Sequence, residues 1–179
     1  MRKVIGIGET ILDIIFKNEQ PTAAKPGGST FNSMITLGRL GVNTEFISEV
    51  GRDRLGKQIK DFLAENNVKS ENVYDYDGGK TALSLAFLDE NMNADYLFYK
   101  NDAAQKLDYV MPKIEENDII VIGSFFSIND ALRENLTYLL DEAKRKKAII
   151  YYDVNFRKNR KSQVRFLMPN ILDNFDLKL

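Results

Sequence analysis

Asp13 is the first residue whose type and setting suggest chemistry. Its neighbours from Ile11 to Phe16 are otherwise apolar. A carboxylate in such surroundings needs a hydrogen-bond partner, because burying its charge alone is costly. One carboxylate can accept hydrogen bonds from two hydroxyl groups, which suits a sugar. The alternative is a surface aspartate on an edge strand, and residue type alone does not choose between the two.

A glycine pair opens the stretch "PGGSTFNSMITLGRLG". Gly27 and Gly28 would let backbone N–H groups approach a ligand, because no Cβ stands in the way. The helix that follows offers unpaired N–H donors at its start. Asn32, in the first turn, supplies both a donor and an acceptor, which again suits a ligand rich in hydroxyl groups. The structural alternative is a tight loop with an asparagine that takes part in capping.

A third polar group follows an apolar segment in "YYDVNFR". If the chain is extended there, Asp153, Asn155 and Arg157 all point to the same side. Arg157 could hold a phosphate or a carboxylate through two parallel hydrogen bonds. The alternative is a polar loop in which Asp153 and Arg157 pair with each other.

The composition narrows the chemistry further. The 179-residue chain contains no His and no Cys, which excludes disulfides, the usual zinc sites and every mechanism that needs an imidazole base. Carboxylates, Lys and Arg, amides, backbone N–H groups and a hard metal such as magnesium remain. This set fits phosphoryl transfer, which depends mainly on positioning and charge neutralisation.

The sequence also argues against several other classes of protein. The formal net charge is -1, and the basic run Lys144–Lys147 is placed where a predicted helix ends, so a nucleic-acid partner is not expected. The pair Gly6-x-Gly8 is followed by Ile11 instead of a third glycine, which argues against a dinucleotide fingerprint. No apolar run reaches membrane-spanning length, and the N-terminus does not resemble a signal peptide, so the expected location is cytoplasmic.

The order of the predicted elements indicates an α/β fold with a parallel sheet covered by helices. In the first helix, Phe31, Met34, Ile35 and Leu40 fall at helical spacing, and Gly41 stands where a C-terminal cap is expected. The predicted strands are Lys3–Gly8, Thr44–Gly51, Asp118–Phe125 and Ala148–Asn155, with a further strand beginning in Asn174–Leu179; the predicted helices follow Pro26 up to Gly41 and span Asp53–Asn67, Asp130–Lys146 and Ser162–Leu172.

A small second sheet is expected to interrupt the alternation of strands and helices. Thr81–Lys100 is predicted to be two strands joined by a polar turn at Asn91–Asn93, and Thr10–Phe16 and Pro21–Pro26 are predicted to be extended. We therefore expect one α/β domain over residues 1–179, incomplete at its C-terminal end, with lid segments at about 10–26 and 80–107. The aromatic side chains Tyr96, Phe98 and Tyr99 are expected in the hairpin core or an interface, or else closing over a ligand.

These pieces together resemble the ribokinase-like family of carbohydrate kinases, of the phosphofructokinase-B type. The resemblance rests on Gly8-Glu9 with Asp13, on "GGSTFNSMITLGRLG" followed by "FISEVGRDRLG", on "FYKNDAA" and on "DVNFR". It implies a Rossmann-like three-layer core with a small β-sheet lid. The glycine spacing that carries most of it consists of Gly27, Gly28, Gly38, Gly41, Gly51 and Gly56.

The resemblance also implies roles for particular residues. Asp13, Gly28 and Asn32 would bind sugar hydroxyls, with Gly27, Asp153 and Asn155 assigned to the same substrate site. Lys100 would lie at the lid edge near the substrate, and Arg157 near the transferred phosphate. ATP and Mg2+ would serve the reaction, no protein residue of this chain is assigned as a metal ligand, and lids of this kind often pair two subunits into a homodimer.

One departure from the family pattern matters for activity. The family's catalytic base is the aspartate of a Gly-x-Gly-Asp motif in the C-terminal part, and this chain contains no such motif. The C-terminal part of the fold and most of the ATP site are therefore expected to be absent, and the chain alone to be inactive. The leading hypothesis is an ATP-dependent sugar kinase, closest to a fructokinase; the alternatives are a non-catalytic sugar-binding or dimerising remnant and a nucleoside kinase.

Overall fold

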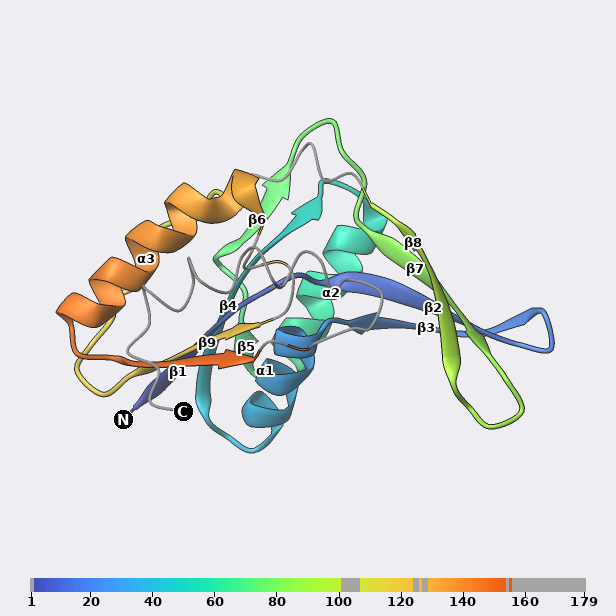
Figure 1. The fold of residues 1–179 in the computed structure, drawn as a ribbon, viewed down its shortest axis with the longest axis horizontal. Coiled ribbons are helices and arrows are strands. Elements are labelled where there is room, and N and C mark those ends of the chain that lie inside the picture. The colour runs from blue at the N-terminus through green and yellow to red at the C-terminus, as the bar shows by residue number, and fades with distance from the viewer. Residues whose placement is uncertain (1, 101–106, 124–125, 127–128, 154, 156–179) are drawn as a thin grey trace.

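Two β-sheets organise the chain (Figure 1). The computed structural model describes residues 2–100, 107–123, 126, 129–153 and 155. The main sheet has the strand order β10-β9-β1-β4-β5, with β6 also paired to β4, and every pairing in it is parallel. Its strands are β1 (Lys3–Ile7), β4 (Asn43–Gly51), β5 (Val68–Lys69), β6 (Val73–Tyr76), β9 (Ile119–Gly123) and β10 (Ile149–Asp153).

Alternation along β1 explains why helices cover both faces of the main sheet. Val4 belongs to the hydrophobic cluster formed with α1 (Ser29–Arg39) and α2 (Arg54–Glu65). Ile5 and Ile7 are fully buried in the cluster that contains the apolar side chains of α3 (Arg133–Arg145). Successive side chains of a strand point to opposite faces. The predicted three-layer α/β core is thus confirmed.

The helix ends follow from local sequence. Asp53 caps α2 as predicted, accepting a hydrogen bond from the Gly56 N–H at 2.8 Å. A single 3-10 turn, η3 (Asp130–Leu132), leads into α3. In α1 the last helical residue is Arg39, and Gly41 follows with φ 79°. Leu40 is therefore the C-terminal cap, just outside the helix, and is 74% exposed, although its spacing from Phe31, Met34 and Ile35 is helical.

The second sheet, which we call the lid sheet, projects from one side of the main sheet (Figure 1). It has the order β3-β2-β7-β8, in which β2 and β3 are antiparallel, β2 and β7 parallel, and β7 and β8 antiparallel. The predicted hairpin of β7 and β8 is therefore present, the two segments predicted to be extended form a second hairpin, and the two hairpins are joined by a pairing between distant segments. The strands are β2 (Ile11–Lys17), β3 (Gln20–Gly27), β7 (Leu83–Leu88) and β8 (Ala94–Tyr99).

The lid sheet leaves aromatic side chains in solvent. Tyr96 and Phe98 stack with ring centroids 5.7 Å apart, yet they are 48% and 50% exposed, and Tyr99 is 53% exposed. The expectation that these rings form a hairpin core was thus wrong. They lie on β8, the edge strand, where no further strand of the lid sheet covers them among the described residues.

Other differences from the sequence prediction are local. The short strands β5 and β6 were not expected, because β5 has only two residues and the polar residues of β6, "VYDY", give no clear apolar alternation. Leu107, at the end of the second expected lid segment, is fully buried in the core of the main sheet. The predicted helix Ser162–Leu172 and strand Asn174–Leu179 lie outside the described residues. In the part of the chain that the structure describes, no helix is both long and apolar enough for a membrane crossing.

Candidate functional site

Asp13 lies at the centre of the candidate site, on β2 of the lid sheet. β2 pairs in parallel with β7, and the register places Asp13 opposite Ser84. The Ser84 hydroxyl, fully buried, donates to Asp13 Oδ1 at 2.5 Å. Asp13 itself is only partly buried. The carboxylate therefore has the partner that its apolar neighbourhood requires, and it still reaches solvent.

Gly27 lies directly against this carboxylate, and Gly28 lies against the backbone of Glu9. A Cβ on Gly27 would stand 2.5 Å from Asp13 Oδ2, and one on Gly28 would stand 2.3 Å from the carbonyl oxygen of Glu9. Gly28 has φ 131° and ψ 145°, and it starts α1 without any side-chain cap. Only glycine adopts this backbone readily. The Asn32 N–H bonds the Gly28 carbonyl at 2.9 Å, and the Asn32 side chain is exposed one turn into α1.

An ion pair joins the lid sheet to the end of β1. Lys100 follows β8, and its Nζ lies 2.5 Å from Oε1 of Glu9; the two side chains are 20% and 25% exposed. The Lys100 ammonium also lies 5.2 Å from the centre of the Phe98 ring, within cation–π range. Phe98 is paired in register with Ser84. Lys100 thus lies at the lid edge, next to the carboxylate site, and is neutralised by Glu9.

Thr30, at the start of α1, packs against the carboxyl ends of β1 and β9. It is 3% exposed, and its side chain lies 2.7 Å from the position of a Cβ on Gly123 and 2.8 Å from that of a Cβ on Gly8. The carboxyl ends of β1 and β9, the start of α1 and Asp13 therefore occupy one region. In open α/β sheets, ligands collect at this edge.

The third predicted group is arranged differently. Asp153 ends β10, the edge strand, two strands away from β1, and its side chain is exposed. Asn155 has φ 43°, and its N–H donates to Asp153 Oδ1 at 2.9 Å. Asn155 is therefore not extended, and the condition under which Asp153 and Asn155 would point to the same side is not met. Arg157 lies outside the described residues.

Burial changes the acid–base behaviour of Asp13. It raises the pKa of the carboxyl above its ordinary value of 3.8, and the hydrogen bond from Ser84 acts in the opposite direction but is smaller. The negative charge of Asp13 is therefore less stable in the folded chain than in water. Additional donors supplied by a ligand would offset this loss, because hydrogen bonds to a carboxylate favour its charged form.

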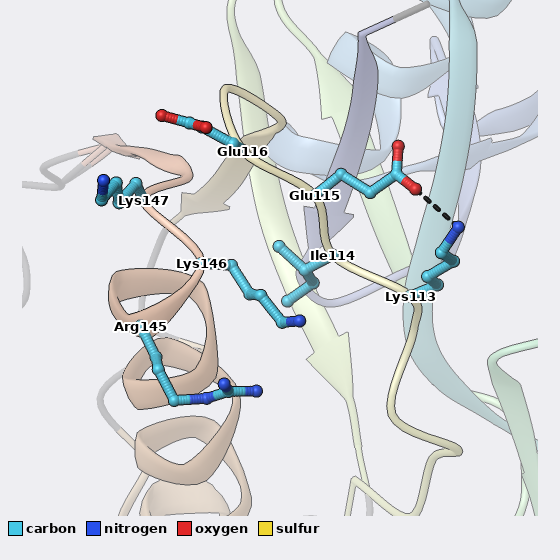
Figure 2. A pocket seen from close by; sticks show the side chains of 7 residues that line it. All are labelled: Lys113, Ile114, Glu115, Glu116, Arg145, Lys146 and Lys147. Atoms are coloured by element: carbon cyan, nitrogen blue, oxygen red, sulfur yellow. Dashed lines mark ion pairs between the residues drawn. The ribbon is translucent and has the colours of Figure 1, made fainter.

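A separate cavity of about 430 Å³ lies at the opposite end of the main sheet (Figure 2). Its lining segments precede β9 and β10, so it opens at the amino ends of those strands. Lys113 pairs with Glu115 at 2.6 Å, and Arg145 pairs with Glu142 at 2.7 Å. Lys147 follows the end of α3, as the basic run predicted. None of the predicted site residues lines this cavity.

Two site residues were not assigned a role from the sequence. Ser84 gave no local signal, because its contact with Asp13 spans 71 positions along the chain. Glu9 was noticed in the Gly8-Glu9 motif, but not as the partner of Lys100. The opposite charges of Glu9 and Lys100 were the available signal, but nothing in the local sequence shows that the two motifs meet.

Comparisons with known proteins agree with this architecture. The family model "pfkB family carbohydrate kinase" matches residues 1–177. A probable fructokinase-3 of Arabidopsis thaliana is 26% identical over 165 residues, covering 86% of this chain and 48% of that protein. Fructokinase-1 of Oryza sativa subsp. japonica is 26% identical over 188 residues, covering 97% of this chain and 58% of the relative. The chain spans about half of the length of these relatives.

Solved structures share the fold. An uncharacterized sugar kinase from Pyrococcus horikoshii in complex with ATP matches with a TM-score of 0.71 and 22% identity, over 96% of this chain and 58% of that one. Fructokinase from Vibrio cholerae O395, bound to fructose, ADP and calcium, matches with a TM-score of 0.77 and 18% identity, over 97% and 57% of the two chains. With the family model covering nearly every residue, the chain belongs to the pfkB family of carbohydrate kinases.

Proposed function

We propose that this chain forms the sugar-binding part of an ATP-dependent kinase that phosphorylates a hydroxyl group of a sugar, with fructose the best candidate. The observation that carries the proposal is the setting of Asp13. Its Oδ1 accepts from Ser84, while Oδ2 faces Gly27 and has no hydrogen-bond donor among the described residues. A half-satisfied carboxylate beside an uncapped helix start offers acceptors and backbone donors together, as sugar hydroxyls require.

The charges around the site favour a neutral sugar. Lys100 and Glu9 neutralise each other, so Asp13 leaves a net negative charge next to the pair. A sugar acid would bring a second carboxylate into this field, and like charges at close range repel. A neutral sugar avoids this repulsion. The plant fructokinases and the Vibrio cholerae fructokinase described above support fructose as the first sugar to test.

The phosphoryl donor is proposed to be ATP, by analogy with the Pyrococcus horikoshii sugar kinase solved with ATP. The family's Gly-x-Gly-Asp base is absent from the sequence, so we expect the chain to bind sugar without turnover. In the described ranges, no group of three acidic side chains gathers as metal ligands, and no step is assigned to a metal ion. A cytoplasmic location remains our proposal.

The proposal is tested by titrating the chain with fructose, gluconate and adenosine in a calorimeter, and by assaying ADP release with each. We expect saturable binding of fructose, weaker binding of gluconate, and no ADP release above the rate without protein. Absence of binding by any sugar would reject the proposed site. Preferential binding of adenosine would instead identify a nucleoside kinase, and sugar-dependent ADP release would refute the expected inactivity.

We further propose that two copies pair through their lid sheets. Leu97 and Tyr99 of β8 are 50% and 53% exposed, and alternation places them on the face opposite Phe98 and Ser84. On that same face Phe16 and Phe87 stack at 4.8 Å from the neighbouring strands. This largely apolar face, on which Asp95 of β8 also lies, is typical of an interface and is unfavourable in solvent. A second lid sheet would cover it without blocking the Asp13 side.

Replacing Leu97 with Asp is expected to weaken the dimer at least about tenfold, since a buried charge would face an apolar partner. Sedimentation equilibrium measures the change. Leu40→Asp is the matched control, because Leu40 is also exposed but lies on the main domain, at the end of α1. Equal dissociation by both variants, or a wild-type chain that is monomeric, would contradict pairing through the lid.

A further inference from the structure

The chain crosses from the main sheet to the lid sheet between β6 and β7, and Thr81 fixes this crossing. Thr81 is 3% exposed. Its N–H donates to Asp53 Oδ2 at 2.8 Å, and its hydroxyl donates to Asp53 Oδ1 at 2.7 Å. The same hydroxyl accepts from the Gly51 N–H at 3.0 Å. One carboxylate therefore clamps both the backbone and the side chain of Thr81.

The surroundings hold the crossing closely. A Cβ on Gly51 would stand 2.4 Å from the Thr81 nitrogen, so only glycine lets the two backbones approach this closely. Before Thr81, the Tyr76 hydroxyl donates to the Lys80 carbonyl at 2.7 Å. The crossing is thus held on one side by the end of β6 and on the other by the start of α2.

This clamp lies only three residues before the candidate site. The Ala82 carbonyl, directly after Thr81, accepts from the Leu12 N–H at 3.0 Å and begins the pairing of β7 with β2. Two steps further the register sets Ser84 opposite Asp13. A one-residue slip of a strand would turn Ser84 to the other face. The position of Thr81 therefore determines whether the Ser84 hydroxyl meets Asp13.

We propose that Asp53 is a positioning residue for the sugar site, acting through Thr81 and the start of β7; this rests on the proposed function. Asp53 contacts neither Asp13 nor Ser84 in any hydrogen bond of the described residues. Its Oδ1 also caps α2 through Gly56, so one side chain joins the helix to the lid crossing. Burial acts to raise the pKa of Asp53, but hydrogen bonds from Gly56 and Thr81 outweigh it and lower the pKa.

Two variants separate this role from helix capping. Asp53→Asn keeps an oxygen for the Gly56 N–H, since asparagine is an equally good N-cap, but turns an NH2 group toward the Thr81 N–H. Thr81→Val replaces the hydroxyl with a methyl group, which removes its hydrogen bond to Asp53 and the bond that it accepts from the Gly51 N–H. Asp61→Asn, on the exposed face of α2, is the matched control. Amide hydrogen exchange resolved by residue reports on the lid, and calorimetry with fructose reports on the site.

We expect Asp53→Asn and Thr81→Val each to speed exchange of the β7 amides about tenfold and to weaken fructose binding by a similar factor, since each loses hydrogen bonds to a charged group. Asp61→Asn should change neither. Faster exchange confined to α2, or spread evenly over the chain, would overturn the proposal, as would unchanged fructose affinity. If Asp53→Asn fails to fold, Thr81→Val decides. If the wild-type chain binds no sugar, the proposed function fails, while the exchange data still decide whether Asp53 holds the lid.

Discussion

Asp13→Asn is expected to weaken fructose binding about 100-fold, because an NH2 donor replaces Oδ2, the acceptor left free for sugar hydroxyls, and the negative charge that strengthens those hydrogen bonds is lost. The substitution preserves the shape of the side chain, and its remaining oxygen can still accept from Ser84. Titration calorimetry measures the loss. Asp95→Asn, on the exposed edge strand β8, is the control for a lid aspartate that is removed from the site. An affinity within a factor of about two of the wild type would exclude Asp13 as a sugar ligand.

The raised pKa of Asp13 also predicts how the Asp13→Asn variant changes stability as a function of pH. The folded carboxyl titrates above the ordinary value of 3.8, so the wild-type fold loses stability as pH rises through the window above 3.8. The neutral amide of the Asp13→Asn variant carries no such penalty. We therefore expect this variant to unfold at higher urea concentration than the wild type at neutral pH, with the difference vanishing below pH 3.8. Fructose affinity of the wild type should fall as acid protonates the carboxyl.

Gly28→Ala is expected to cost about 3–5 kcal/mol of the free energy of unfolding, from an unfavourable backbone and a steric clash together. The φ of 131° disfavours any side chain, and the new Cβ would meet the Glu9 carbonyl oxygen at 2.3 Å. Urea denaturation followed by circular dichroism measures the loss.

Gly41→Ala is the control for a positive φ without a steric contact. Gly41 also has a positive φ, of 79°, but a Cβ there would meet nothing within 4 Å. Its substitution should cost only about 1 kcal/mol. If both variants lose equal stability, the close approach of Gly28 to the Glu9 carbonyl is not the reason that position 28 requires glycine.

Local signals made the fold largely predictable. The apolar spacing of α2 and the capping residue Asp53 are properties of neighbouring positions, so sequence alone located that helix. Leu40 continues the helical spacing of α1, but the helix already ends at Arg39, which the spacing alone does not show. The exposure of Phe98 was not predictable either, since apolar character does not reveal whether another chain or a ligand covers a residue.

The site was predictable only in its separate parts. Asp13 and Gly28 stood out through residue type and context, and the structure brings them to the same place. Ser84 and the contact between Glu9 and Lys100 depend on pairings across the lid sheet, which no local pattern encodes. The turn at Asn155 arises from an aspartate that bonds its own downstream backbone, a competitor to the extended form that the alternation suggested.

The parallel pairing of β2 with β7 also has a consequence for the order in which the chain folds. Each lid hairpin connects neighbouring residues and can form on its own within microseconds. The contact between Asp13 and Ser84 closes a loop of 71 positions, and that loop contains α1, β4 and α2. Because the entropic cost of loop closure falls once the intervening segment is compact, we expect this contact to form after the main sheet. Asp13 would then meet Ser84 in a late folding step, so a formed sugar site would indicate that the main sheet has already folded.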